Sequence, residues 1–251
     1  MSAVDMNADV GETSIDQDRL LLPYLTSCNV CCGAHAGDAE LIVATIREAI
    51  RLGVSIGAHP SYPDRPGFGR RFVPLSEERL ASELLFQIGA VKSASEAFGR
   101  KLSHIKPHGA LYHAVRSAGR QAEILIEVAE RIAPDAAIVG QAGSPLGELA
   151  TRRGFAFRHE GFADRRYQTA NALVPRTDSG ALIETESDFR DHLAEILSGR
   201  IRDVAGRQTA VPIDTICLHG DTPTAVRFAQ IARAMMSERY SPLGKRDRMS
   251  S

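Results

Sequence analysis

Several features are scarce or absent in this sequence of 251 residues. Tryptophan is missing, only 6% of residues are aromatic, and cysteine occurs four times. Neither charge sign dominates, because 30 Lys and Arg face 31 Asp and Glu, for a net charge of -1. Nucleic-acid binders usually carry a clear basic excess, so nucleic acid is not the expected partner. No apolar run approaches the roughly 18 residues that span a bilayer, so no membrane segment is expected.

The first ten residues lack the basic start and apolar stretch of a secretory signal, which makes the cytoplasm the default expectation. Disulfides are then not expected. Three of the cysteines crowd into one segment, as Cys28, Cys31 and Cys32. Cys28 and Cys31 have the spacing of half a zinc site, but no second Cys or His pair follows. We therefore predict that these cysteines are small apolar residues of a buried strand.

Short apolar runs alternate with helical patterns along the whole chain, as expected for a parallel sheet with helices packed outside. The seven strand-like runs cover residues 3–8, 27–33, 54–58, 102–105, 136–140, 155–159 and 214–218. Helices are expected to start after Asp38, Ser76, Ser144, Ser187 and Thr222, and another over residues 121–132. The length suits one α/β barrel. We predict one barrel domain over 1–240 and a flexible basic tail over 241–251.

Two stretches, 60–74 and 161–179, are expected to be long loops, because they are rich in Arg, Asp, Gly and Pro. Loops of this length in a compact domain are usually functional or disordered. No glycine pattern typical of a nucleotide-binding loop occurs.

Nearly every apolar run ends in a polar or ionisable cluster. Five histidines and one lysine follow the runs, and neither residue type is a turn former. These residues are His35, His59, Lys106, His108, His159 and His219. In a closed parallel barrel all carboxyl ends of the strands share one rim, where active sites lie. We therefore expect these side chains to converge, although polar residues also mark loop entries in any fold.

The first run alternates polar and apolar residues. Asp5, Asn7 and Asp9 share one face of an extended chain. Three polar groups inside a barrel need partners such as a cation, water or a substrate amide. The alternative is an edge strand facing water.

Asp9, His59 and His108 together form a two-histidine, one-carboxylate set suited to a divalent metal. Alternatively, His59 and His108 transfer protons or contact phosphate, or are histidines hydrogen-bonded within loops. The loop arginines suit a carboxylate or phosphate. On position alone, the catalytic candidates are Asn7, Asp9, His35, Lys106, His108 and His219. The substrate-binding candidates are Arg70, Arg71, Asp164, Arg165, Arg176 and Asp221.

These junctions also resemble a known family. The motifs are Asp5–Glu12, Ser27–Asp38, Gly57–Pro60, Gly67–Arg71, Lys106–Tyr112, Phe162–Tyr167, Leu173–Arg176 and Cys217–Asp221. From about residue 4 to 235 the chain is similar to the lactam-utilisation family, which supplies the A component of the ATP-dependent 5-oxoprolinase. The resemblance implies a TIM-like, irregular seven-stranded (β/α) barrel like those of the polysaccharide deacetylase group.

It also implies that 5-oxoproline, a cyclic amide, is cleaved to L-glutamate with ATP hydrolysis. In that family, the partner subunits B and C are thought to phosphorylate the lactam oxygen, and the A component to open the ring. Two other functions remain open: a metal-dependent amidase or deacetylase acting without ATP, and a non-catalytic subunit that binds the substrate. The sequence also leaves homo-oligomerisation open.

Overall fold

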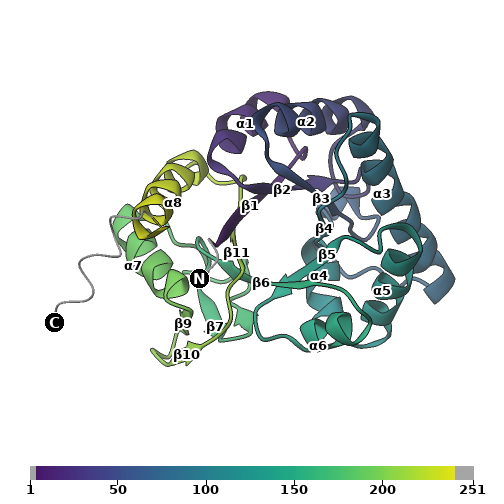
Figure 1. The fold of residues 1–251 in the computed structure, drawn as a ribbon. Coiled ribbons are helices and arrows are strands. Elements are labelled where there is room, and N and C mark those ends of the chain that lie inside the picture. The colour runs from purple at the N-terminus through teal and green to yellow at the C-terminus, as the bar shows by residue number, and fades with distance from the viewer. Residues whose placement is uncertain (1–3, 241–251) are drawn as a thin grey trace.

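Seven parallel strands close into a barrel at the centre of the molecule (Figure 1). The computed structural model describes residues 4–240. The order around the barrel is β1-β11-β6-β5-β4-β3-β2. The strands are β1 (Asp5–Val10), β2 (Ser27–Cys31), β3 (Ser55–His59), β4 (His104–Ile105), β5 (Ala137–Gln141), β6 (Phe157–Phe162) and β11 (Thr215–Leu218). Each overlaps one predicted run, so the irregular seven-stranded, TIM-like α/β barrel is confirmed. The predicted tail, 241–251, lies outside the described residues.

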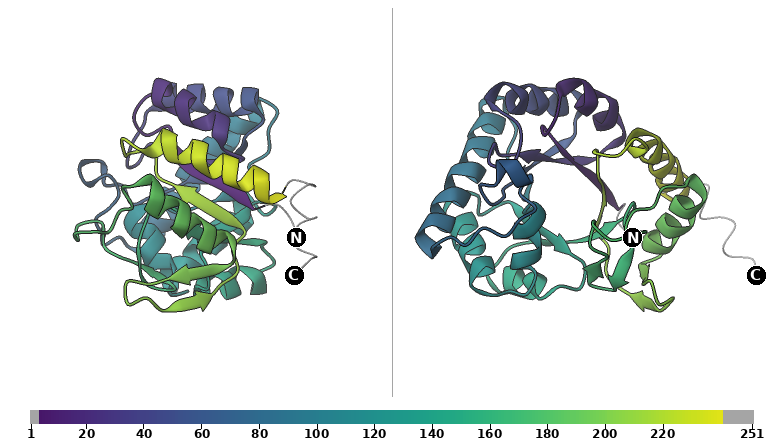
Figure 2. Two further views of the ribbon diagram at one scale, coloured as in Figure 1. Left: turned by 90° about the vertical axis from the view of Figure 1, so that its left-hand side faces the viewer. Right: turned by 180° about the vertical axis from the view of Figure 1, so that it is seen from behind.

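Helices surround the barrel, as both views from the side and from behind show (Figure 2). They are α1 (Ile15–Leu21), α2 (Ala39–Leu52), α3 (Glu77–Ala97), α4 (Gly109–Val115), α5 (Arg120–Ile132), α6 (Pro145–Arg152), α7 (Glu186–Leu197) and α8 (Ala225–Tyr240), with 3-10 turns η1 (Leu22–Tyr24) and η2 (Arg65–Gly67). Asp38 caps α2 by accepting a hydrogen bond from the Leu41 amide. The predicted cap Ser187 is wrong, because Thr185 accepts the capping bond from Asp188 and Ser187 lies in the first turn. None of the described helices is long and apolar enough to cross a bilayer.

The segment between β6 and β11 departs from simple alternation of strand and helix. It contains two small antiparallel pairs, β7 (Tyr167–Thr169) with β8 (Ala172–Leu173) and β9 (Arg200–Arg202) with β10 (Gln208–Ala210). The expectation of a plain loop over 161–179 is therefore wrong. The 60–74 loop is as expected, since η2 is its only regular element. Strands of two or three residues are too short for an alternating pattern to be recognised.

The strand β1 separates a polar barrel interior from the apolar layer beneath the helices. Met6, Ala8 and Val10 belong to the buried hydrophobic cluster. Asp5 and Asn7 turn to the other side. Asp5 accepts hydrogen bonds from the hydroxyls of three neighbours, Thr26 at 2.5 Å, Ser27 at 2.7 Å and Thr215 at 2.6 Å. The predicted alternation is confirmed, and the polar face points inward, which makes the edge-strand alternative wrong.

A glycine in β3 makes room for a buried histidine. A Cβ placed on Gly57 would overlap the imidazole of His104, which is held by a 2.7 Å hydrogen bond to Asn29. We expect Gly57→Ala to lower the free energy of unfolding by about 1–3 kcal/mol through overpacking. Gly89→Ala, in α3 where the new methyl group has no atom within 4 Å beyond its chain neighbours and the backbone of its own helix, is the control and should stabilise by up to about 1 kcal/mol. Urea denaturation followed by circular dichroism measures both, and equal effects would contradict the overpacking argument.

Candidate active site at the mouth of the barrel

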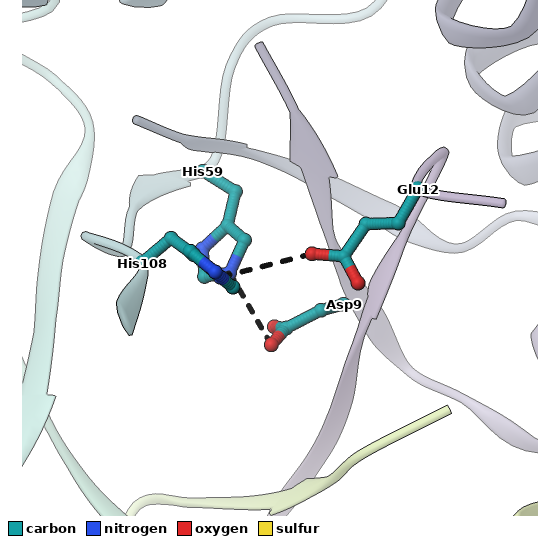
Figure 3. Close-up of side chains that lie close together, drawn as sticks. All are labelled: Asp9, Glu12, His59 and His108. Atoms are coloured by element: carbon teal, nitrogen blue, oxygen red, sulfur yellow. Dashed lines mark hydrogen bonds and ion pairs between the residues drawn. The ribbon is translucent and has the colours of Figure 1, made fainter. Parts of the chain in front are cut away.

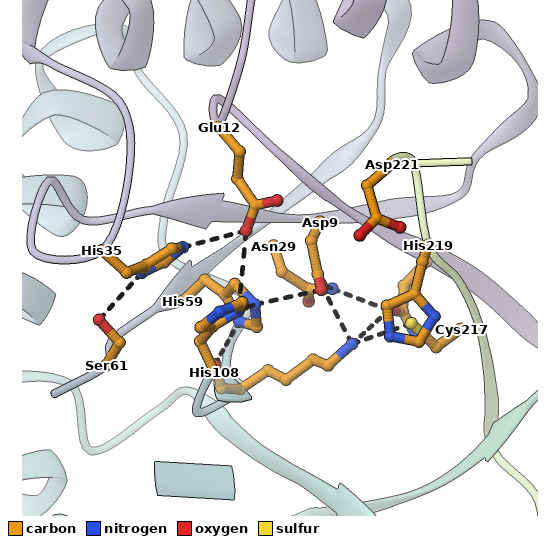
Figure 4. A network of polar contacts seen from close by, with 12 residues as sticks. Asp9, Glu12, Asn29, His35, His59, Ser61, His108, Cys217, His219 and Asp221 are labelled. Carbon is orange, nitrogen blue, oxygen red and sulfur yellow. Dashed lines mark hydrogen bonds and ion pairs between the residues drawn. The ribbon is translucent and has the colours of Figure 1, made fainter. Parts of the chain in front are cut away.

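Asp9, near the carboxyl end of β1, lies at the centre of a polar network (Figure 4). Its Oδ1 accepts hydrogen bonds from Asn29 at 2.8 Å and from the Lys106 ammonium at 3.2 Å. Its Oδ2 lies 3.2 Å from Nε2 of His59. Burial alone would raise the pKa of Asp9, but His59 and Lys106 outweigh it and hold the pKa well below its usual range. Asp9 is therefore an ionised carboxylate that is largely shielded from solvent.

Lys106 follows β4 and is only 3% exposed. Its ammonium lies 2.8 Å from Glu160, 3.2 Å from the Asn7 amide oxygen and 3.1 Å from the Cys217 sulfur. Burial alone would lower the pKa of Lys106, but Asp9 and Glu160 hold it well above its usual range. Lys106 is thus a fixed positive charge in the barrel interior, and it neutralises carboxylates rather than reaching toward solvent.

His59, at the end of β3, and His108, before α4, lie edge to face with ring centroids 4.8 Å apart. Nε2 of His59 is 2.9 Å from Nδ1 of His108. His35, which follows β2, stacks on His108 at 3.9 Å with the rings nearly parallel. Burial first, and then His59, lowers the pKa of His35 to about 3, so this imidazole is neutral. The predicted convergence of Asp9, His59 and His108 is confirmed (Figure 3).

Glu12 belongs to this cluster and was not among the predicted site residues. Gly11 has a φ of +74°, a left-handed conformation that glycine adopts freely, and it directs the chain so that Glu12 faces the mouth. The Glu12 carboxyl contacts Nε2 of His35 at 3.0 Å and lies 3.7 Å from His108. Burial, together with the nearby Asp9 charge, raises the pKa of Glu12 to about 7. The signal in the sequence was a carboxylate directly after a Gly at a strand end.

Two further interior residues were also missed. Glu160 in β6 binds Lys106 and accepts a hydrogen bond from Asn7 at 3.1 Å. Asn29 in β2 donates to both Asn7 and Asp9 at 2.8 Å. Each is a polar residue inside an otherwise apolar strand. His159 is the exception among the strand-end histidines: it precedes Glu160 and so faces the outside of the barrel, against Phe157.

His219 lies on the other side of Asp9 and is oriented by Asp164. Nδ1 of His219 lies 3.0 Å from the Asp164 carboxylate, which also accepts the His219 backbone N–H. Because a carboxylate only accepts, Nδ1 carries the proton when Asp164 is ionised. Burial would raise the pKa of Asp164, but His219 outweighs it and the pKa is lowered. The pair resembles the carboxylate–imidazole pairs that move protons in enzymes.

The arginines predicted to bind substrate fall into separate groups. Arg70 at 2.8 Å and Arg176 at 2.5 Å both donate to Asp221, which follows His219 closely in the chain. Arg165 is buried, and its only hydrogen bond, to the Val174 carbonyl, leaves Nε without a partner among the described residues. Arg71 instead pairs with Asp64 within the 60–74 loop, so the structure places it in a loop contact and not in the network at the mouth.

The Asp221 ion pairs predict a pH dependence of stability. Burial would raise the pKa of Asp221, but its hydrogen bond and charge pairing with Arg176, aided by Arg70, lower it. A lowered carboxyl pKa stabilises the fold above the unfolded value, about 3.9, and this contribution is lost as the pH falls further. We expect Asp221→Asn to destabilise the protein most at pH 7 and progressively less as the pH falls from about 4 toward 2. Urea denaturation across that range tests this, and a constant difference would contradict it.

The four cysteines are buried thiols without disulfides, as predicted. Burial raises the pKa of Cys28, Cys31 and Cys32, so none is a ready thiolate. Cys217 is buried as well and contacts Lys106. A zinc site at Cys28 and Cys31 gains no second ligand pair among residues 4–240, since the groups of metal-ligating side chains lie around Asp9.

The fold and this mouth define a TIM-like (β/α) barrel whose candidate active site is formed by the carboxyl ends of its strands. Residues 4–248 match the LamB/YcsF family, and the chain therefore belongs to it. This is the family of lactam-utilisation proteins and of the 5-oxoprolinase A component. It is also similar to the solved lactam utilization protein of Thermus thermophilus, with 34% identity, a TM-score of 0.85, and 94% of this chain and 96% of that chain covered. The resemblance found in the sequence is confirmed.

The barrel is also similar in fold to a GH30 endoxylanase of Clostridium papyrosolvens. The identity is 12%, the TM-score is 0.54, and the match covers 94% of this chain and 72% of that chain. At this identity the match shows the fold alone.

Proposed function

We propose that this chain is the ring-opening A component of an ATP-dependent 5-oxoprolinase, which cleaves 5-oxoproline to L-glutamate. The observation that carries the proposal is the meeting of Asp9, Lys106 and the histidines at one barrel mouth. Membership of the lactam-utilisation family supports a cyclic amide as substrate. ATP is proposed to act through partner subunits B and C, because this chain carries no nucleotide-binding glycine motif.

The proposed chemistry starts from a lactam whose oxygen has received the γ-phosphoryl group of ATP. Water adds to the ring carbon and loses its proton to Asp9 or the adjacent His59, 3.2 Å away. The carbon–nitrogen bond then breaks, and the ring nitrogen takes up a proton from His219, which Asp164 orients. The product is an acyl phosphate, which a second water converts to glutamate and phosphate. The sum consumes one ATP and two waters per ring.

The surroundings of the network suit a small cyclic amide. A small hollow lies directly beside Asp9. Its lining consists of Asp9, Glu12, Thr13, Gln17, Asp18, Leu21, Gly220 and Asp221. The Phe162 ring stacks near His219 at 5.8 Å and offers an apolar face for ring methylenes. Arg70 and Arg176, both on Asp221, are the groups proposed to neutralise the substrate carboxylate or phosphate.

The test is a reconstituted assay that follows glutamate release from 5-oxoproline. We expect release only when this chain, subunits B and C and ATP are all present. Glutamate release by the isolated chain without ATP would contradict the proposal and favour the amidase alternative. Undiminished release by B and C alone would contradict it as well and would leave this chain, at most, the role of a substrate-binding subunit.

A further inference from the structure

Nε2 of His59 and Nδ1 of His108 face each other, and neither carries a hydrogen when both rings are neutral. Nδ1 of His59 donates to the Lys106 carbonyl oxygen at 2.7 Å, and Nε2 of His108 donates to the Phe68 carbonyl oxygen at 2.8 Å. A carbonyl oxygen only accepts, so these outer nitrogens carry the ring protons. The inner nitrogens, 2.9 Å apart, therefore present two lone pairs to each other. Such an arrangement requires a positive occupant, either an extra proton or a metal cation.

Two carboxylates face the same point. Oδ2 of Asp9 lies 3.2 Å from Nε2 of His59, and Oε1 of Glu12 lies 3.7 Å from Nδ1 of His108 (Figure 3). One ligand atom from each of the four residues lies within 4.8 Å of all the others. Two carboxylates and two imidazoles form a four-ligand set of the kind that holds a zinc-type cation in proteins. We propose that Asp9, Glu12, His59 and His108 bind one divalent cation of the zinc type.

The dimensions fit such a cation. With metal–ligand bonds of about 2.0–2.2 Å, tetrahedral ligand atoms lie about 3.3 Å apart, and the shortest contacts here are 2.9 and 3.2 Å. Glu12 needs the largest adjustment. Histidines that bind metals usually donate their second N–H to a carbonyl or carboxylate, as both of these do. Asp9 Oδ1 is already bound by Lys106 and Asn29, which leaves Oδ2 for the metal.

The mixture of imidazole and carboxylate ligands favours zinc and its first-row neighbours over magnesium or calcium. A second group near Asp9, formed with Cys217 and His219, also has suitable spacing. It fits a cation less well, because it offers three ligand residues rather than four and the Lys106 ammonium lies 3.1 Å from its Cys217 sulfur.

The experiment is a titration of chelator-treated full-length protein with Zn²⁺ by calorimetry, and with Co²⁺ by visible absorption. We expect one ion per chain. Loss of a hydrogen-bond partner behind a metal ligand lowers metal affinity by about 10–100-fold. His59→Gln and His108→Gln each remove a ligand itself and should weaken Zn²⁺ binding by more than that. Glu12→Gln should weaken it less. His113→Gln, an exposed histidine of α4 outside the cluster, is the control and should bind as the wild type does.

Circular dichroism of each variant establishes that it is folded, and Glu12→Gln, which conserves shape, provides a test should the histidine variants not fold. The proposal is overturned if the wild type binds no more Zn²⁺ than the folded His59→Gln or His108→Gln variant. If neither histidine variant folds, the same comparison is made with Glu12→Gln. A shared proton between the two rings would then be the remaining explanation. Because the readout is cation binding, this outcome is independent of whether the chain opens lactams.

Discussion

Replacing Lys106 by Met is expected to lower the free energy of unfolding by about 3–5 kcal/mol, the cost of breaking a buried ion pair by removing one partner. Methionine fills much of the same space but carries no charge. Asp9 and Glu160, whose oxygens lie 3.2 and 2.8 Å from the ammonium, would then share the barrel interior without a cation between them. Because the protein has no tryptophan, circular dichroism during urea denaturation is the suitable measurement.

The matched control is Lys101→Met. Lys101 and its partner Asp135 are both exposed and 3.8 Å apart, so this change should stay within about 0.5 kcal/mol. A second variant separates charge from packing: Glu160→Gln in the Lys106→Met background removes one uncompensated carboxylate and should recover part of the loss. If Lys106→Met were no more destabilising than Lys101→Met, the assignment of Lys106 as the central countercharge would be wrong.

The sequence was sufficient for the barrel and for the convergence of distant residues. At least one helix separates successive barrel strands, and strand ends in a parallel barrel share one rim, so Asp9, His59, His108 and His219 had to meet once the sheet closed. Topology therefore carried this prediction, since no local motif links these positions. The same rule failed for His159. Successive side chains of a strand point to opposite faces, so the bounds of β6 were needed to decide whether His159 or Glu160 pointed into the barrel.

The residues that were missed are those whose role depends on packing inside the barrel. Asn29, His104 and Glu160 lie within short strands that resemble apolar runs, and a single polar residue there looks like a local exception. Their partners lie far away in the chain, as in the His104–Asn29 hydrogen bond across 75 positions. Only the register of the strands shows that each buried polar group is satisfied by another. The sequence therefore predicted the residues at the strand ends but not these polar residues inside the barrel.

Asp9→Asn is expected to have the largest effect on catalysis and to reduce kcat for the proposed cleavage of 5-oxoproline by about 10²–10⁴-fold, the usual contribution of a general acid or base. The amide keeps the shape of the side chain but removes the charge that faces both His59 and Lys106. It no longer offers a charged carboxylate oxygen to the attacking water or to a bound cation. Glutamate release by the reconstituted subunits with ATP measures kcat, and circular dichroism verifies that the variant is folded.

The control for this variant lies on the same strand. Asp5→Asn removes an identical charge four residues earlier, where Thr26, Ser27 and Thr215 donate to the carboxylate at the opposite end of the barrel interior. That change should lower the unfolding free energy, since a carboxylate that accepts three hydrogen bonds becomes an amide, but it should leave kcat within a few-fold of wild type. Equal loss of kcat in both variants would mean that the charge on β1 supports the barrel as a whole, and Asp9 would lose its assigned part in the reaction.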